Sequence, residues 1–294
     1  MYEQHYGLVE EPFSLTPDPK YFYRSESHHR AFELLQYAIQ RREGFMVVSG
    51  DIGTGKTTLC RAVLDTMQKN VYSALLLNPF LTETDLLKTI VEDFGVPMPG
   101  MKNTPFITKQ DLINALNSFL IYVSENNGRA VLLIDEAQNI PLATLEQIRI
   151  ISNLETHKQK LLQIVLVGQL ELLDVLSRPE LRQLYQRVSI KCQLDPLSGD
   201  EVASYIRHRL TIAGGGSAKV DFRSDGLKEI YRYSGGIPRL INLIADRSLL
   251  AGMALGSSRI DRRMVREAVD NLQLKKPKAT WKLWPFGARS ARAR

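Results

Sequence analysis

The sequence has few cysteines, no long apolar run and little net charge outside one segment. Its two cysteines, Cys60 and Cys192, lie far apart and form no CxxC pair, which argues against a disulfide framework or a cysteine-based metal site. No apolar run approaches the ~18 residues of a membrane span, and the first residues lack the basic and apolar stretches of a secretory signal. With 44% hydrophobic and 24% charged residues, the composition is that of an ordinary globular protein, which we expect in the cytoplasm with reduced thiols.

The formal charge of +6 is concentrated near one end of the sequence. Residues 275–294 carry seven Lys and Arg and no acid, so the remainder is close to neutral. The same tail holds Trp281, Trp284 and Phe286 among two prolines, which make it a poor helix. Three interpretations stay open for it: a disordered solubilising end, contact with an anionic membrane surface or a membrane protein, and contact with nucleic acid.

Between residues 45 and 194, short apolar runs alternate with helical patterns, which predicts an α/β fold with a five-stranded parallel sheet. Four of the runs are almost continuously apolar, as strands covered by helices on both faces are, and the fifth alternates like an edge strand. The expected strands are Phe45–Ser49, Val71–Leu77, Ala130–Asp135, Leu162–Gly168 and Arg187–Leu194.

Beyond Pro196 the strand pattern stops, and a small all-helical domain is expected. Its helices are Ser198–Ala213, Ser224–Tyr233, Ile237–Ala254 and Asp261–Leu272. The sequence therefore divides into an N-terminal segment with a first helix (1–44), the α/β domain (45–196), the helical domain (197–272) and the basic aromatic tail (273–294).

Residues 50–57 match the full pattern G-x-x-x-x-G-K-[ST] of a phosphate-binding loop. The match follows an expected strand and opens a helical pattern, which is the order that this loop requires. Its glycines let successive backbone N–H groups surround a phosphate, while Lys56 would reach the β- and γ-phosphates and Thr57 would bind Mg²⁺. The residues expected to bind the nucleotide are Gly50, Asp51, Ile52, Gly53, Thr54, Gly55, Lys56, Thr57 and Thr58.

Two carboxylates, Asp135 and Glu136, follow the apolar run Val131–Ile134. The carboxyl end of this strand should lie beside the loop, where ligands of open α/β sheets bind. We expect Asp135 to hold Mg²⁺ together with Thr57, and Glu136 to act as the general base that activates a water molecule.

With these motifs the chain resembles the AAA+ ATPases, and within them the general secretion pathway protein A (ExeA-like) group. It looks similar to the ATPases of MSHA or type IV pilus biogenesis and of exosortase systems. The resemblance covers about residues 1–272. It rests on Tyr6–Leu8, Pro12-Phe13, Pro17–Pro19, Gly50–Thr57, Asp135–Gln138, Ser152–Glu155, Val167–Gln169, Leu181–Gln183, Gln186-Arg187 and Ser234–Arg239. It implies a P-loop α/β domain followed by a helical lid, with ATP and Mg²⁺ as cofactors.

The resemblance also implies three further catalytic residues. Gln169 falls where the family has its polar sensor of the γ-phosphate, although it could also be an ordinary polar strand end. Arg187 falls at the arginine finger, which reaches the site of the next subunit; the nearby Arg182 and Arg178 are alternatives. Arg239 falls at the second sensor in the lid, or else faces solvent.

The function that the resemblance implies is an ATP-hydrolysing assembly motor or switch for a bacterial pilus, secretion or export system. It would work as a homo-oligomeric ring, for instance a hexamer, with an envelope-apparatus protein as client, and it could lie at the inner membrane through residues 275–294. Two alternatives stay open. One is a nucleic-acid-binding ATPase of the transposition or replication-initiator type. The short tail after Leu272 argues against it, because the tail is too small for a domain that reads DNA. The other is a scaffold that binds ATP without hydrolysing it, against which Glu136 argues.

Two groups before the first strand stay without an assigned function. His28 and His29 have no ligand partners at metal-binding spacing, so we expect both on a solvated face. Tyr21, Phe22 and Tyr23 could form a wall for the adenine or pack in the core.

Overall fold

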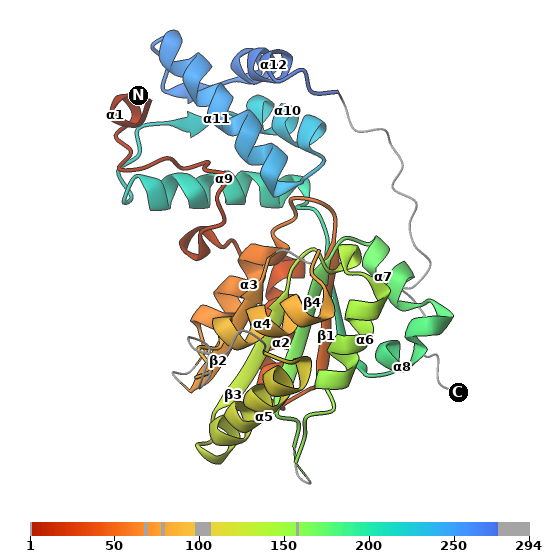
Figure 1. The fold of residues 1–294 in the computed structure, drawn as a ribbon. Coiled ribbons are helices and arrows are strands. Elements are labelled where there is room, and N and C mark those ends of the chain that lie inside the picture. Colours follow the sequence, from red (N-terminus) through yellow and green to blue (C-terminus); the bar gives the residue numbers. More distant parts are fainter. Residues whose placement is uncertain (1, 68–69, 78–79, 98–106, 157–158, 276–294) are drawn as a thin grey trace, which may run out of the picture.

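A five-stranded parallel sheet forms the centre of the larger lobe (Figure 1). The computed structural model describes residues 2–67, 70–77, 80–97, 107–156 and 159–275. The strand order is β2-β3-β4-β1-β5, and all four neighbouring pairs are parallel. The strands are β1 (Phe45–Gly50), β2 (Val71–Leu76), β3 (Arg129–Ile134), β4 (Leu162–Gly168) and β5 (Val188–Leu194). The predicted fold class is confirmed, and each strand lies within one residue of its expected bounds.

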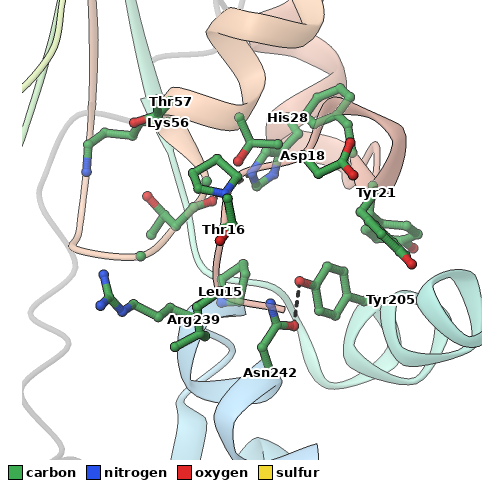
Figure 2. A pocket seen from close by; sticks show the side chains of 18 of the residues that line it. Leu15, Thr16, Asp18, Tyr21, His28, Lys56, Thr57, Tyr205, Arg239 and Asn242 are labelled. Atoms are coloured by element: carbon green, nitrogen blue, oxygen red, sulfur yellow. Dashed lines mark hydrogen bonds between the residues drawn. The ribbon is translucent and has the colours of Figure 1, made fainter. Parts of the chain in front are cut away.

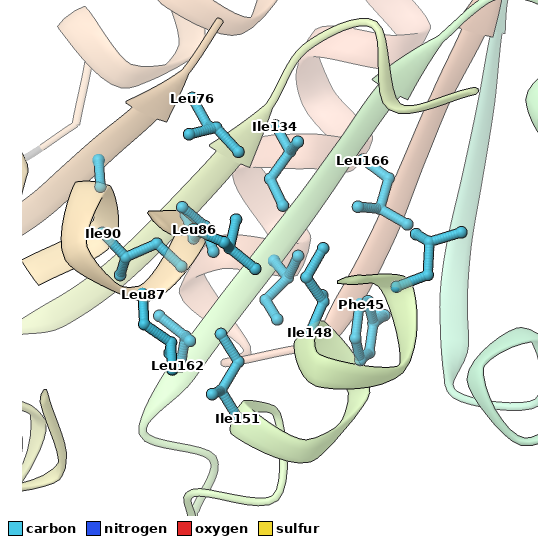
Figure 3. Close-up of a cluster of buried hydrophobic side chains, with 14 of the residues drawn as sticks. Phe45, Leu76, Leu86, Leu87, Ile90, Ile134, Ile148, Ile151, Leu162 and Leu166 are labelled. Carbon is cyan, nitrogen blue, oxygen red and sulfur yellow. The ribbon is translucent and has the colours of Figure 1, made fainter. Parts of the chain in front are cut away.

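Helices cover both faces of this sheet, which explains why its central strands are apolar throughout. Alternate residues of a strand point to opposite faces. Phe45 and Val47 therefore pack in the core under α4 to α8 (Figure 3), whereas Met46 and Val48 pack against α2 and α3. The helices are α2 (Glu26–Gln40), α3 (Lys56–Asp65), α4 (Glu83–Asp93), α5 (Lys109–Glu125), α6 (Leu142–Ile151), α7 (Glu171–Leu176) and α8 (Arg182–Tyr185).

Side-chain caps fix where several helices begin. The hydroxyls of Ser25, Thr82 and Thr108 accept backbone N–H groups at the starts of α2, α4 and α5. These bonds satisfy amides that have no partner within the helix. Among the helices of the described residues, none is long and apolar enough to span a membrane.

The smaller lobe is a bundle of four helices above the sheet, which we call the lid (Figure 1). Its helices are α9 (Gly199–Ala213), α10 (Ser224–Ser234), α11 (Pro238–Ala254) and α12 (Arg262–Asn271). The expectation that strands stop after Pro196 was wrong in one detail, because β6 (Asp221–Phe222) and β7 (Arg259–Ile260) form a short parallel pair. Strands of two residues are too short to leave an alternating pattern in a sequence.

Most of the segment before α2 packs on the lid. The segment contains α1 (Tyr2–Tyr6) and the short helix η1 (Pro19–Tyr21). Its last part, around η1 and Phe22, also contacts α2 and α3. The buried rings of Tyr2, Tyr6 and Phe13 belong to the lid core, and the Tyr6 hydroxyl donates to the carbonyl of Leu249 at 2.9 Å. The chain therefore passes from the lid to the α/β domain just before α2. The predictions for the tail concern residues that lie almost entirely outside the described part of the chain, which reaches Lys275.

Candidate active site

The glycine-rich loop joins the carboxyl end of β1 to the start of α3. Gly53 and Gly55 have φ angles of 81° and 96°, in the left-handed region that residues with a side chain seldom adopt. The loop therefore curves tightly enough to bring its backbone amides and the first turn of α3 to one point. Residues 52–58 line a cleft at this point, whereas Gly50 and Asp51 are not among its lining residues.

Lys56, the first residue of α3, lies inside the curve of this loop. Its side chain is buried, with 6% exposure, and its ammonium donates to the carbonyls of Gly50 and Asp51, each at 2.9 Å. Burial lowers the pKa of Lys56, while the nearby carboxylates of Glu136 and Asp135 act in the opposite direction. The loop thus holds a buried cation close to two acids.

Thr57 and Asp135 meet although they belong to α3 and to the end of β3. The Thr57 hydroxyl donates to Asp135 Oδ2 at 2.5 Å, and Asp135 Oδ1 accepts the backbone N–H of Glu136 at 2.8 Å. A hydroxyl and a carboxylate are the hard oxygen ligands that suit Mg²⁺. Among the described residues no cluster of three or more His, Cys, Asp and Glu could hold a metal by itself. This pair therefore fits a Mg²⁺ that takes its remaining ligands from phosphate and water.

Glu136 belongs to a small network of polar side chains at the ends of β3 and β4. Its Oε2 atom accepts the side-chain amide of Gln138 at 2.7 Å and that of Gln169 at 3.3 Å. The backbone N–H of Gln169 in turn donates to Oε1 of Gln138 at 3.0 Å. The structure thus brings Gln169 to Glu136, and it adds Gln138, which sequence reasoning missed although the residue lies in a quoted motif.

The lid touches the loop through the start of α11. Arg239, the second residue of this helix, donates its backbone N–H to the carbonyl of Gly53 at 3.2 Å. A β-carbon on Gly53 would lie only 2.6 Å from that of Arg239, so the glycine also permits this close approach. The start of α11 and the loop are therefore in direct backbone contact.

The cleft lies between the loop, the lid and the N-terminal segment (Figure 2). Tyr21, Phe22 and Tyr23 all line it, and Tyr21 also belongs to the lid core. Both interpretations of these rings thus have a basis, and contact with an adenine stays a prediction. The labelled lining residues in Figure 2 are Leu15, Thr16, Asp18, Tyr21, His28, Lys56, Thr57, Tyr205, Arg239 and Asn242.

Arg209 of α9, which sequence reasoning also missed, fastens the N-terminal segment to the lid. Its side chain is 5% exposed and donates to the carbonyls of Pro12 and Ser14. The guanidinium lies over the ring of Tyr21, 4.4 Å from the centroid, and donates to the hydroxyl of Tyr205 at 2.9 Å. No local sequence pattern predicts this role, because the two carbonyls that Arg209 binds in the N-terminal segment lie almost 200 positions away.

The expectation of a solvated histidine pair was wrong for His28 and right for His29. His28 is only 4% exposed; its Nδ1 lies 2.7 Å from Ser25 Oγ and its Nε2 lies 2.8 Å from the carbonyl oxygen of Thr54 in the loop. His29 lies on the exposed side of α2. The missed signal was the helical spacing of His28 with Phe32 and Leu35, which places all three on the buried face of α2.

His28 should make the stability of the protein depend on pH. Burial lowers its pKa from the ordinary value of 6.5, so at acidic pH the unfolded chain binds more protons than the folded one. The His28 contribution to the free energy of unfolding is therefore complete above that value and decreases as the pH falls below it. We expect His28→Gln to reduce the fall in melting temperature between about pH 7.5 and about pH 5.5.

The matched control for this measurement is His29→Gln, which changes the exposed neighbour. It should leave the pH dependence of the melting temperature as in the wild type. His208, whose pKa burial also lowers, acts in the same direction and is present in all three proteins. Parallel curves for His28→Gln and wild type would contradict the prediction.

Arg187 lies at the opposite end of the sheet from the loop. It precedes Val188, which pairs with Phe45, the first residue of β1, whereas the loop leaves the last residue of that strand. Its guanidinium donates to Ser152 Oγ at 2.9 Å and also to Asn153 and to the carbonyl of Arg149. The structure therefore does not bring Arg187 to the cleft of its own chain. Arg182 and Arg178, the alternatives, are exposed.

Taken together, the strand order, the loop, the acidic residues after β3 and the helical lid define a P-loop nucleotide-binding protein of the AAA+ class. The family described as AAA domain matches residues 39–176. Over 263 residues the chain is 44% identical to general secretion pathway protein A of Aeromonas hydrophila. The chain belongs to the AAA+ ATPases of this general secretion pathway protein A type. The match covers 88% of the chain and 46% of the relative, so the chain spans about half the length of that protein.

Solved structures share the fold at low sequence identity. The ORC2 protein of Aeropyrum pernix superposes with a TM-score of 0.68 at 17% identity, over 89% of this chain and 71% of that one. CDC6P of Pyrobaculum aerophilum gives 0.66 at 19% identity, over 90% and 71%. The RuvB Holliday junction branch migration motor of Thermotoga maritima gives 0.55 at 20% identity, over 85% and 70%. At these identities the likeness demonstrates the fold alone.

Proposed function

We propose that this chain binds Mg·ATP in the cleft, hydrolyses it, and uses the cycle as an assembly motor or switch of a bacterial pilus, secretion or export system. The observation that carries the proposal is the meeting of Lys56 and Thr57 of the loop with Asp135 and Glu136 after β3. The fold neighbour from Aeropyrum pernix was solved with ADPNP and ADP, which supports an adenine nucleotide as the ligand.

The residues of the cleft suit the separate tasks of this reaction. The loop amides and Lys56 would bind the phosphates, and Thr57 and Asp135 would hold Mg²⁺. When bound, Mg²⁺ neutralises charge on the phosphate oxygens. Glu136 would orient the attacking water and accept its proton as general base. Gln169, which contacts Glu136, would donate its side-chain amide to the γ-phosphate or to that water.

The lid would convert the state of the nucleotide into movement. Arg239 begins the helix whose backbone touches Gly53, so a guanidinium that contacts the γ-phosphate would fix the angle between the lid and the sheet. Loss of that phosphate would release this contact. Because Arg209 fastens the N-terminal segment to the lid, both should move together.

The position of Arg187 supports a homo-oligomeric ring, with a hexamer as one option. Since it lies far from the loop of its own chain, an arginine finger at this position would act on the site of the next subunit. The printed name of the Aeromonas relative favours a secretion apparatus as client. Contact with the inner membrane through residues 275–294 is part of the same proposal. The nucleic-acid-binding alternative has the composition of that tail and the fold likeness in its favour.

Calorimetry and a phosphate-release assay test the proposal. The wild type should bind ATP in a Mg²⁺-dependent manner and release phosphate. Lys56→Ala should weaken binding at least about tenfold, because it removes charge-assisted hydrogen bonds to phosphate. Lys88→Ala on α4, a half-buried lysine that does not line the cleft, is the control and should bind as the wild type does. Absence of binding by the wild type would overturn the proposal, and binding without phosphate release would favour the scaffold alternative.

A further inference from the structure

We propose that Gln138 is a positioning residue, which orients the carboxylate of Glu136 toward the attacking water and ties it to the backbone at Gln169. The inference deepens the proposed function and rests on it. Gln138 lies on the one-turn helix η2 (Ala137–Asn139) that follows Glu136. Both polar atoms of its side-chain amide are used, one toward each partner.

The orientation of the Gln138 amide follows from its partners. The backbone N–H of Gln169 can only donate, so the Gln138 atom that faces it at 3.0 Å must be the oxygen. The NH₂ group must then face Glu136, whose Oε2 lies 2.7 Å away. Gln138 is thereby fixed as a donor to the ionised form of Glu136, which is the form that a general base needs.

The surrounding backbone is shaped for this contact. Glu136 has a φ of 50°, in the left-handed region that is uncommon for residues other than glycine, and the resulting turn brings the side chain of Gln138 back to it. A β-carbon on Gly168 would lie 2.6 Å from Oε1 of Gln138. The end of β4 therefore needs a glycine for Gln138 to reach the amide of Gln169.

The network leaves one oxygen of Glu136 for chemistry. Oε2 accepts two amide donors, from Gln138 and Gln169, whereas Oε1 has no hydrogen-bond partner among the described residues. Glu136 lines the cleft. With one oxygen held by two donors, the carboxylate cannot rotate freely, and its second oxygen is kept available to accept a proton.

Gln138→Met and Gln138→Glu test this role against a merely structural one. Methionine keeps the length of the side chain but loses both hydrogen bonds; kcat should fall roughly tenfold to a hundredfold, while KM and the calorimetric Kd for Mg·ATP stay within about threefold. Glutamate keeps an acceptor for the amide of Gln169 but turns a second carboxylate toward Glu136. Its kcat should fall at least as far.

A purely structural role would give different results. It predicts near wild-type kcat for Gln138→Glu, because the bond to Gln169 is kept, and this outcome would overturn the inference. The double variant Glu136→Gln/Gln138→Met should be no slower than Glu136→Gln alone, since Gln138 acts through Glu136. A further loss in the double variant would also overturn it. Gln110→Met, an exposed glutamine at the start of α5, is the matched control and should behave as the wild type.

The same series separates failure of this inference from failure of the proposed function. If Glu136→Gln is inactive and both Gln138 variants are within twofold of the wild type, Gln138 has no positioning role and the general base stands. If Glu136→Gln itself keeps full turnover, the assignment of the base in the proposed function is wrong. Melting temperatures and nucleotide Kd values verify that each variant is folded.

Discussion

Glu136→Gln is expected to bind Mg·ATP as tightly as the wild type and to hydrolyse it at least about a hundredfold more slowly. Of the two carboxylates after β3, that of Glu136 is the one proposed to accept the proton of a water, since the carboxylate of Asp135 already accepts the hydroxyl of Thr57 and a backbone amide. Glutamine has the same shape, but an amide is too weak a base to take that proton. Binding should survive because the phosphate contacts come from the loop.

Phosphate release under saturating ATP and calorimetry with Mg·ATP measure the two halves of this prediction separately. Glu33→Gln, which changes an exposed glutamate on α2, is the control for the loss of one negative charge. Full turnover by Glu136→Gln would refute the assignment of the base. Weak binding by the same variant would mean that Glu136 acts mainly by stabilising bound ATP in the ground state and not by stabilising the transition state.

The parts of the site that lie on contiguous sequence could be predicted from the sequence. Lys56 and Thr57 follow a glycine pattern whose backbone geometry is set by a few adjacent residues. Asp135 and Glu136 directly follow a run of buried apolar residues, and the carboxyl ends of parallel strands share one edge of a sheet. The contact between Thr57 and Asp135 is the consequence, and it spans 78 positions in the chain.

The side chains that support the site could not be predicted in the same way. Arg209 and Gln138 act through contacts with backbone groups that only the folded chain brings near them, and neither belongs to a pattern with a known backbone geometry. His28 is an intermediate case. Its spacing with Phe32 predicts a buried position, but its contact with the carbonyl of Thr54 depends on how α2 packs against the loop.

These supporting contacts share a physical feature that bears on the mechanism. His28 binds a carbonyl of the loop, Arg239 binds another, and Gln138 binds an amide at the end of β4. Each contact fixes a backbone group of a residue that is itself proposed to act in the site. Catalysis by positioned dipoles requires such rigidity, because groups that must reorganise during the reaction stabilise the transition state less.

Arg187→Ala and Lys56→Ala are each expected to be nearly inactive alone, whereas a mixture of the two should regain activity. An arginine finger contributes about 10³–10⁵ in rate by stabilising charge on the transferred phosphoryl group. A subunit with Arg187→Ala keeps an intact loop, and a neighbour with Lys56→Ala keeps the finger. In randomly mixed rings, about a quarter of the interfaces would join an intact loop to an intact finger.

The measurement is phosphate release at several mixing ratios, after the subunits have been allowed to exchange. Activity should be greatest near equal amounts and absent from either pure variant; no recovery at any ratio would count against a site shared between subunits. Because Arg187 also donates to Ser152 and to the carbonyl of Arg149, melting temperatures must show that Arg187→Ala is folded. Arg182→Ala, which changes the exposed alternative, is the comparison. If Arg182→Ala is inactive and regains activity when mixed with Lys56→Ala, the finger is Arg182. Arg187 then serves to fix the end of α6.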